Sequence, residues 1–136
     1  MADAIHLDIL TPEKVVFSDS IETVTAPGSL GEFGVLPGHA ALVTTLEIGE
    51  VAIKKDNREY WLAISGGFAE VGNDKVTILA EAAELAQEID IKRAETAKIQ
   101  AEEKLKSLSS DDSQFSEVTL ALKRATNRIK VSARKT

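Results

Sequence analysis

The 136-residue sequence contains no cysteine, only two histidines and few aromatic residues, and each of these shortages excludes a kind of chemistry. Without cysteine the chain forms no disulfide and no thiolate metal site. His6 and His39 lie far apart in the sequence, and a zinc site would need both of them, so we predict no metal site. Aromatic residues make up 4% of the chain. The core is therefore expected to consist mainly of Val, Ile, Leu and Ala.

Long hydrophobic runs are also missing. No stretch approaches the length of apolar sequence that a membrane-spanning helix needs, so we expect the chain not to cross a bilayer. The first residues, Met1-Ala2-Asp3-Ala4, lack the basic region and apolar segment of a secretory signal. We therefore expect a cytoplasmic location, with any membrane association provided by a partner.

Charge is distributed unevenly along a chain whose net charge is −6. Residues 1–85 carry 14 acidic and 5 basic side chains, a net of −9, whereas residues 86–136 carry 8 and 11, a net of +3. No acidic residue occurs from Val118 to the end of the sequence. This basic stretch favours an anionic partner, such as nucleic acid, acidic lipid or an acidic protein patch, over the alternative of a solvated basic face.

The first two-thirds of the chain has the pattern of β-structure. Apolar residues alternate at Ile5, Leu7 and Ile9, which predicts a half-buried strand. Short β-rich runs continue to Ala80. The turn signals between them are Pro27-Gly28, Pro37-Gly38, Asp56-Asn57, Gly66-Gly67 and Gly72-Asn73-Asp74. Many short strands at this spacing are typical of an antiparallel sandwich or barrel, and we predict an antiparallel β-sandwich over residues 1–85.

The remaining residues, 86–136, have the pattern of two helices. Helix-forming residues without Gly or Pro run from Glu88 to Leu108, and Phe115 to Ile129 carries a second apolar stripe at helical spacing. Ser109-Ser110-Asp111-Asp112 separates them and offers N-cap residues. The chain is therefore predicted to be α+β, with a C-terminal antiparallel two-helix hairpin. Because one facing stripe is rich in alanine, it buries little area, and we expect the hairpin to detach or open.

Glycine-rich segments in the sequence do not match nucleotide-binding or catalytic motifs. The segment from Gly67 to Lys75 has the glycine spacing of a P-loop but lacks the Lys-Ser/Thr pair. Ser65-Gly66-Gly67 lacks the flanking residues of a nucleophile elbow. We predict that the protein is not an enzyme.

Four segments resemble, in order, those of the epsilon subunit of bacterial F-type ATP synthases, and the resemblance covers essentially the whole chain. They are Asp8-Ile9-Leu10-Thr11-Pro12-Glu13, the segment from Gly31 to Ala40, the segment from Ile64 to Val71, and Ile89-Asp90-Ile91-Lys92-Arg93-Ala94. The resemblance implies a non-catalytic rotor subunit of the central stalk, which couples proton-driven rotation to ATP synthesis. It also implies a peripheral position on the cytoplasmic face of the bacterial inner membrane, reached only through the complex.

The resemblance implies that the sandwich binds the gamma subunit and the ring of c subunits. The loop from Gly31 to Ala40 would lie at the foot of the stalk. Its c-ring contact residues would be Gly31, Glu32, Phe33, Gly34 and His39. For Glu32 the alternative is an exposed loop carboxylate, and for His39 we favour a hydrogen bond that shapes the loop over a role in proton transfer.

The hairpin is the regulatory element of that family and inhibits ATP hydrolysis when it is extended along gamma. Its basic helix would contact an acidic segment of the beta subunit, beside alpha, through Lys123, Arg124, Arg128, Lys130 and Arg134. The family requires no cofactor, but some bacterial members bind ATP as a regulatory ligand. The corresponding residues here are Glu84, Ile89, Asp90, Arg93, Ala94, Arg124 and Arg128.

Two alternatives stay open at this stage for the residues and the function. Asp90 would also serve as a helix cap that pairs with Arg93, and Gln100 stands where certain ATP-binding members have arginine. A free-standing ATP-sensing module is the second functional hypothesis. A nucleic-acid-binding barrel is disfavoured because the sandwich region is strongly acidic, and we expect no nucleic-acid partner.

Overall fold

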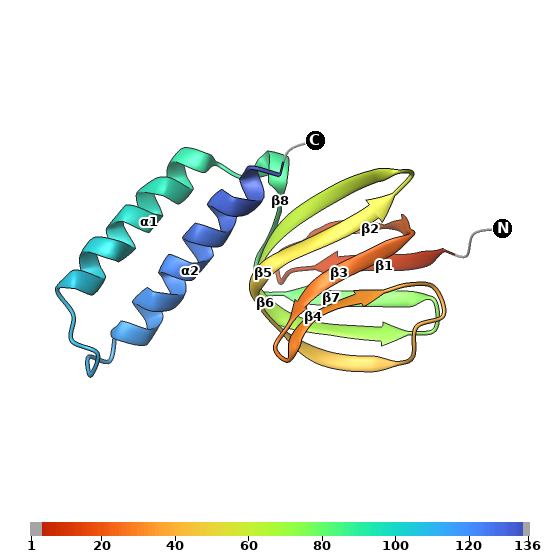
Figure 1. Ribbon diagram of the computed structural model, residues 1–136, viewed down its shortest axis with the longest axis horizontal. Helices are drawn as coiled ribbons and strands as arrows, with labels where there is room; N and C mark the ends of the chain where they lie inside the picture. Colours follow the sequence, from red (N-terminus) through yellow and green to blue (C-terminus); the bar gives the residue numbers. More distant parts are fainter. Residues whose placement is uncertain (1–3, 135–136) are drawn as a thin grey trace.

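The computed structural model describes residues 4–134, in which eight strands precede two helices (Figure 1). The strands are β1 (Ile5–Leu10), β2 (Val15–Ile21), β3 (Thr23–Gly28), β4 (Gly31–Val35), β5 (Leu42–Lys55), β6 (Arg58–Gly72), β7 (Lys75–Ala80) and β8 (Ala83–Leu85). A short 3₁₀ turn, Ala86–Glu88, leads to α1 (Ile91–Lys106) and α2 (Phe115–Ser132). Residues 1–3 and 135–136, at the outer ends of the two predicted domains, lie outside the described residues.

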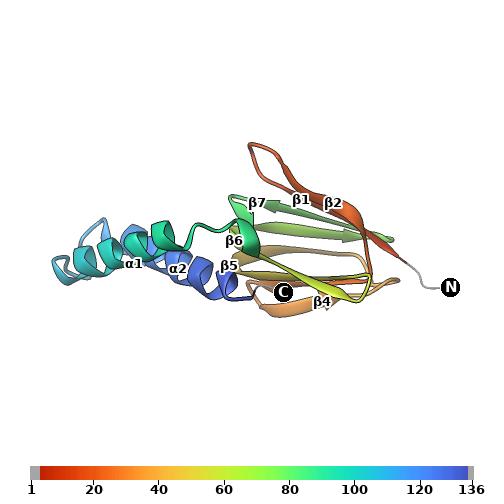
Figure 2. The same ribbon diagram turned by 90° about the horizontal axis from the view of Figure 1, so that it is seen from above.

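The strands form a sheet with the order β2-β1-β7-β6-β5-β3-β4, and β8 pairs with β6. The pairs are antiparallel except for β1 and β7, which run parallel. β5 and β6 are 14 and 15 residues long and pair along their length. The sheet folds over at the bend of these two strands, which closes it into the predicted sandwich. The two helices lie together beyond one end of it (Figure 2).

The core of the sandwich is aliphatic, as the composition predicts. The alternation at Ile5, Leu7 and Ile9 is confirmed, because all three side chains are buried while His6 is exposed. The largest fully buried side chains in the sandwich are Ile5, Leu7, Ile9, Val24, Val35, Val51, Ile53, Leu62, Ile64, Val76 and Ile78. Phe17, Phe33 and Tyr60 are only partly buried and pack against the outside of this cluster.

The turn predicted at Gly66-Gly67 is wrong, because both glycines lie inside β6. The two short runs predicted on either side of them are one continuous strand. Both residues have positive φ angles, +95° at Gly66 and +136° at Gly67, and this conformation bends the strand. A Cβ atom at Gly67 would lie 1.9 Å from the backbone oxygen of Leu79. Glycine is therefore needed here for the close approach of β6 to its paired strand β7, and such a glycine pair has the same local sequence pattern as a turn.

The helical hairpin differs from the prediction at its ends. α1 begins at Ile91, since Asp90 is its N-cap and accepts a hydrogen bond from the backbone N–H of Arg93 at 3.1 Å. The connector spans residues 107–114 and is longer than predicted, because α1 already ends at Lys106. The predicted facing stripes are confirmed at their centres. Ala94, Ala101, Val118 and Ala125 are all buried between the helices or against the sandwich.

We predict that Gly67→Ala lowers the free energy of unfolding by about 3 kcal/mol or more, because the added methyl group collides with the backbone of β7. Urea denaturation of the full chain measures this. Gly38→Ala is the matched control. Gly38 also has a positive φ, of +82°, but nothing lies within 4 Å of the added Cβ, so this change should cost only about 1 kcal/mol. Equal losses in the two variants would contradict the explanation by close approach to β7.

Candidate functional site

The hairpin rests on the sandwich through the C-terminal part of α2, and its tip points away from the strands (Figure 1). A small apolar cluster forms the joint. Val131 of α2 is fully buried against Ala63 of β6, Ala86 of the 3₁₀ turn and Ile89 of the linker. Trp61 packs at the edge of this cluster. The joint therefore holds together the linker, the end of α2 and the middle of the longest strand.

Two polar contacts lie beside this cluster on α2. The side chain of Asn127 donates a hydrogen bond from Nδ2 to the carbonyl oxygen of Gly49 at 2.8 Å. Arg128 forms an ion pair with Glu84 of β8, with Nε 2.7 Å from Oε1. That close pair is not aligned as a hydrogen bond, and Nη2 donates to Oε2 at 3.4 Å instead. Both contacts join α2 to the sandwich edge formed by β5, β6 and β8.

A second polar group sits at the last turn of α2. The carboxylate of Glu50 on β5 lies 3.1 Å from Nζ of Lys130 and accepts a hydrogen bond from Nε of Arg134 at 2.7 Å. Nη2 of Arg134 donates to the other carboxylate oxygen at 3.3 Å. The Arg134 guanidinium also stacks over the ring of Trp61, 4.3 Å from its centroid. One carboxylate therefore binds two cations, Lys130 in the last turn of α2 and Arg134 just beyond the helix end.

The pKa of Glu50 reflects this environment. Burial alone would raise the pKa of the carboxyl, but hydrogen bonds from Arg134 and Lys130 together with their positive charges outweigh it and hold the pKa below its ordinary value. A carboxylate with a lowered pKa in the folded state stabilises that state above its ordinary pKa, and the stabilisation is lost as the pH falls through the lowered value. At neutral pH Glu50 is therefore fully charged and its contribution is complete.

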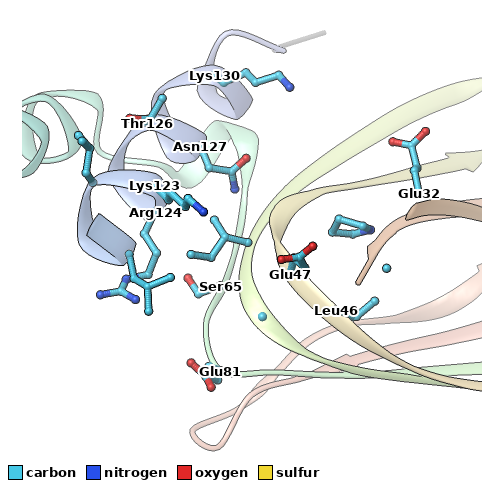
Figure 3. Close-up of a pocket in the computed structure, with 16 residues that line it drawn as sticks. Glu32, Leu46, Glu47, Ser65, Glu81, Lys123, Arg124, Thr126, Asn127 and Lys130 are labelled. Carbon is cyan, nitrogen blue, oxygen red and sulfur yellow. The ribbon is translucent and has the colours of Figure 1, made fainter. Parts of the chain in front are cut away.

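An open groove of about 880 Å³ separates the middle of α2 from the sandwich (Figure 3). Its lining side chains carry opposite charges on the two walls. Those on α2 are Lys123, Arg124 and Lys130, whereas those on the sandwich are Glu32, Glu47 and Glu81. Within residues 4–134, Lys123 and Arg124 form no ion pair. The hairpin thus contacts the sandwich at the end of α2, and the groove separates the two in the middle of the helix.

Apolar side chains cover part of the outer face of the sheet, on the strands that run from β2 to β5. Val15 pairs with Leu10, Leu10 with Leu79, and Leu79 with Phe68, so these four side chains form a row across four neighbouring strands. Val43 of β5 lies diagonally beside Phe68. The exposed fractions are 60% for Val15, 44% for Leu79, 51% for Phe68 and 73% for Val43. We call this set the outer apolar face, and contiguous exposure of this kind marks a binding surface.

Comparison with known families gives a match along nearly the whole chain. The family described as ATP synthase, Delta/Epsilon chain, beta-sandwich domain, matches residues 4–86. The family of the long alpha-helix domain of the same Delta/Epsilon chain matches residues 87–133. This chain belongs to the ATP synthase delta/epsilon family. The resemblance noted in the sequence is confirmed, and members of this family are non-catalytic subunits of the synthase.

Individual relatives agree with this assignment. The ATP synthase epsilon chain of Geotalea uraniireducens is 48% identical over 98% of this chain and 97% of its own length. That of Desulforamulus reducens is 47% identical over 97% and 99%. A chain in the cryo-EM structure of the Euglena gracilis mitochondrial ATP synthase, OSCP/F1/c-ring, superimposes with a TM-score of 0.80 at 26% identity, covering 92% of this chain and 79% of that one. A chain of the Tetrahymena thermophila mitochondrial ATP synthase, central stalk/c-ring, shares the fold, with a TM-score of 0.64 at 15% identity.

Neither helix of this family member, over the described residues, has the length and hydropathy to cross a membrane.

The residues predicted to contact the c ring do not form one loop in this epsilon-family chain. Gly31, Glu32, Phe33 and Gly34 belong to strand β4, because Val35 at its end is buried in the core and the strand pairs with β3. His39 lies in the following loop, so the length of β4 separates it from Glu32. Nδ1 of His39 is 2.6 Å from the carbonyl oxygen of Ala40, a contact that shapes this loop. Contact with a c ring stays a prediction for all five residues.

The residues predicted to bind ATP are divided between two places. Glu84 and Arg128 pair with each other at the joint, whereas Asp90 and Arg93 line a hollow on α1 with Lys92 and Gln100. Ile89 and Ala94 are buried, and Arg124 lines the groove. The helix cap expected as the alternative role of Asp90 is present. ATP binding stays a prediction.

Three of the five residues predicted to contact a beta subunit already have partners inside this chain. Arg128 pairs with Glu84, and Lys130 and Arg134 pair with Glu50. No motif or spacing in the sequence indicates the roles of Glu50, Trp61 and Val131 at the joint. The external anionic partner that the basic stretch favours stays a prediction, and the carboxylates that these three cations contact here, Glu50 and Glu84, are internal.

Proposed function

We propose that this protein is the epsilon subunit of a bacterial F-type ATP synthase and acts in the rotor of its central stalk. In this role it couples proton-driven rotation to ATP synthesis at the cytoplasmic face of the inner membrane, and its hairpin inhibits ATP hydrolysis. Family membership supports the assignment to the synthase. The similar chains occur in structures whose names include the c ring and the central stalk.

The observation that carries this proposal is the outer apolar face, which we propose as the surface that binds the gamma subunit. A monomer in water gains nothing from exposing Phe68, Val43 and Val15 together, whereas burial in an interface contributes roughly 25 cal/mol per Å² of apolar area. The face is also rigid, since each of its strands packs on the core through the alternate residues. It therefore presents a preformed surface to a partner.

Charged side chains are the basis for two further proposed contacts, one with the c ring and one with a beta subunit. Glu32 at the start of β4 and the nearby glycines would face polar loops of the c ring. Lys123 and Arg124 have no ion-pair partner within residues 4–134, so they are the first candidates for contact with acidic side chains of a beta subunit. Arg128, Lys130 and Arg134 would join them only after the joint opens.

We predict that Phe68→Ser weakens binding to the gamma subunit of the same synthase by about tenfold or more, because a buried aromatic anchor is removed from the interface. Titration calorimetry with purified gamma measures the dissociation constant. Ile99→Ser is the matched control, since Ile99 is a similarly exposed apolar residue on α1, 54% exposed, and should leave the affinity unchanged. Unchanged binding by Phe68→Ser would contradict the proposed interface.

A second proposal is that ATP binds the hairpin as a regulatory ligand, which also keeps the ATP-sensing hypothesis open. The supporting observation is the hollow of about 500 Å³ in which Lys92 and Arg93 lie beside Asp90. The two cations suit phosphate groups, and the carboxylate suits a ribose or adenine donor. Glu84 and Arg128 would have to exchange their mutual ion pair for contacts with the nucleotide.

For this proposal we expect saturable binding of Mg-ATP by the full chain in titration calorimetry, and its loss in Arg93→Ala. Lys98→Ala is a suitable control, because Lys98 lies on α1 outside the hollow. If wild-type protein shows no binding at millimolar ATP, Asp90 and Arg93 serve only the helix start.

A further inference from the structure

One carboxylate, that of Glu50, makes two of the polar contacts in the joint between hairpin and sandwich. Glu50 contacts Lys130 and Arg134 at once, and its own side chain is only 13% exposed. The two cations are far more accessible, at 63% and 41%. A single, largely buried carboxylate on strand β5 therefore holds two exposed side chains, one from the last turn of α2 and one just beyond its end.

Arg134 makes a second contact that gives this group its geometry. Its guanidinium plane stacks on Trp61 while two of its nitrogens donate to Glu50. Lysine at this position would supply the charge but not the planar double hydrogen bond with stacking. Trp61 also packs against the apolar cluster in which Val131 is fully buried. The charged contacts thus cover the apolar joint from the solvent side.

The apolar joint is too small to hold the hairpin firmly without help. Its buried members are two alanines, one valine and one isoleucine, with Trp61 at the edge, so the apolar area removed from water is limited. Along the rest of α2 the groove separates helix and sandwich, and Lys123 and Arg124 have no ion-pair partner within the described residues. The balance between a docked and an undocked hairpin therefore depends on the few polar contacts at the end of α2.

We propose that Glu50 keeps the hairpin docked by binding Lys130 and Arg134, while Arg134 stacks on Trp61. We call this group of contacts the clasp. Removal of the clasp charge leaves the cations in water and the apolar joint unprotected, so the last turns of α2 detach more often. The fold of the sandwich does not depend on the clasp, because the Glu50 side chain is not part of the sandwich core.

The clasp also determines which cations an external partner can reach. While Glu50 holds Lys130 and Arg134, Lys123 and Arg124 are the basic side chains of α2 without an ion-pair partner among residues 4–134. Opening the clasp adds Lys130 on the same helix and Arg134 just beyond its end. This consequence for the synthase rests on the proposed function, whereas the clasp itself is a property of the chain alone.

The test is hydrogen exchange of the backbone amides of residues 127–134 in the full chain at neutral pH. Glu50→Gln keeps the size of the side chain and removes its charge, and we expect about tenfold faster exchange in this segment, the loss expected for charged hydrogen bonds. Amides of β1 and β7 should not change. Glu47→Gln is the matched control, since Glu47 lies on the same strand and lines the groove without an ion pair to the described residues.

A second pair of variants tests the clasp from the helix side. Lys130→Gln together with Arg134→Gln should reproduce the faster exchange, and Trp61, the only tryptophan, should become more accessible to acrylamide quenching. Lys123→Gln with Arg124→Gln removes the same charge and should change neither readout. Exchange at residues 127–134 that is unchanged in Glu50→Gln, or equally faster in Glu47→Gln, would overturn the proposal.

The same variants separate the clasp from the function of the complex. Faster exchange in Glu50→Gln supports the clasp whatever the synthase does. If the reassembled synthase with this variant then hydrolyses ATP at an unaltered rate, the regulatory role under the proposed function fails and the clasp stands. Unaltered exchange combined with an altered rate of hydrolysis would overturn the clasp and leave the regulatory role in place.

Discussion

The bend in the long β5–β6 pair is the constraint on which the other features depend. Gly66 and Gly67 adopt backbone angles that favour glycine, and Gly67 passes so close to β7 that no side chain fits. Across the pair, Gly49 on β5 has the same restriction, since a Cβ there would lie 2.7 Å from Pro27. The bend lets one strand pair serve both layers of the sandwich and turns its outer corner toward the hairpin.

The positions of the functional residues follow from this bend. On one side of the bend, Glu50 of β5 and Trp61 and Ala63 of β6 contact the end of α2. On the same side, the carbonyl group of Gly49 accepts the hydrogen bond from Asn127. On the other side of the bend, the same two strands carry Val43 and Phe68 of the outer apolar face. The outer apolar face and the joint to the hairpin are thereby fixed relative to each other by one strand pair, which suits the proposed role of a rotor subunit with a regulatory hairpin.

Much of this fold is predictable from the sequence, because the hydrophobic alternation of strands and the helical stripes of the hairpin are local patterns. Residues such as Ile5, Leu7 and Val118 occupy the positions that their spacing indicates. The bend is not predictable in this way, since Gly66-Gly67 has the local pattern of a turn and its role depends on the close approach to the paired strand β7. The partners of Lys130 and Arg134 are likewise hidden, because Glu50 lies some eighty residues earlier in the chain.

The central claim is that a self-sufficient sandwich carries a hairpin attached through a small, partly ionic joint. Deletion of everything after Glu88 tests it most directly, by urea denaturation and by assays of gamma binding and ATP hydrolysis in the reassembled synthase. The account predicts that residues 1–88 fold cooperatively and bind gamma as the full chain does, and that inhibition of hydrolysis is lost. A truncated chain that is unfolded, or folded but unable to bind gamma, would contradict the division into a stable sandwich and a detachable hairpin.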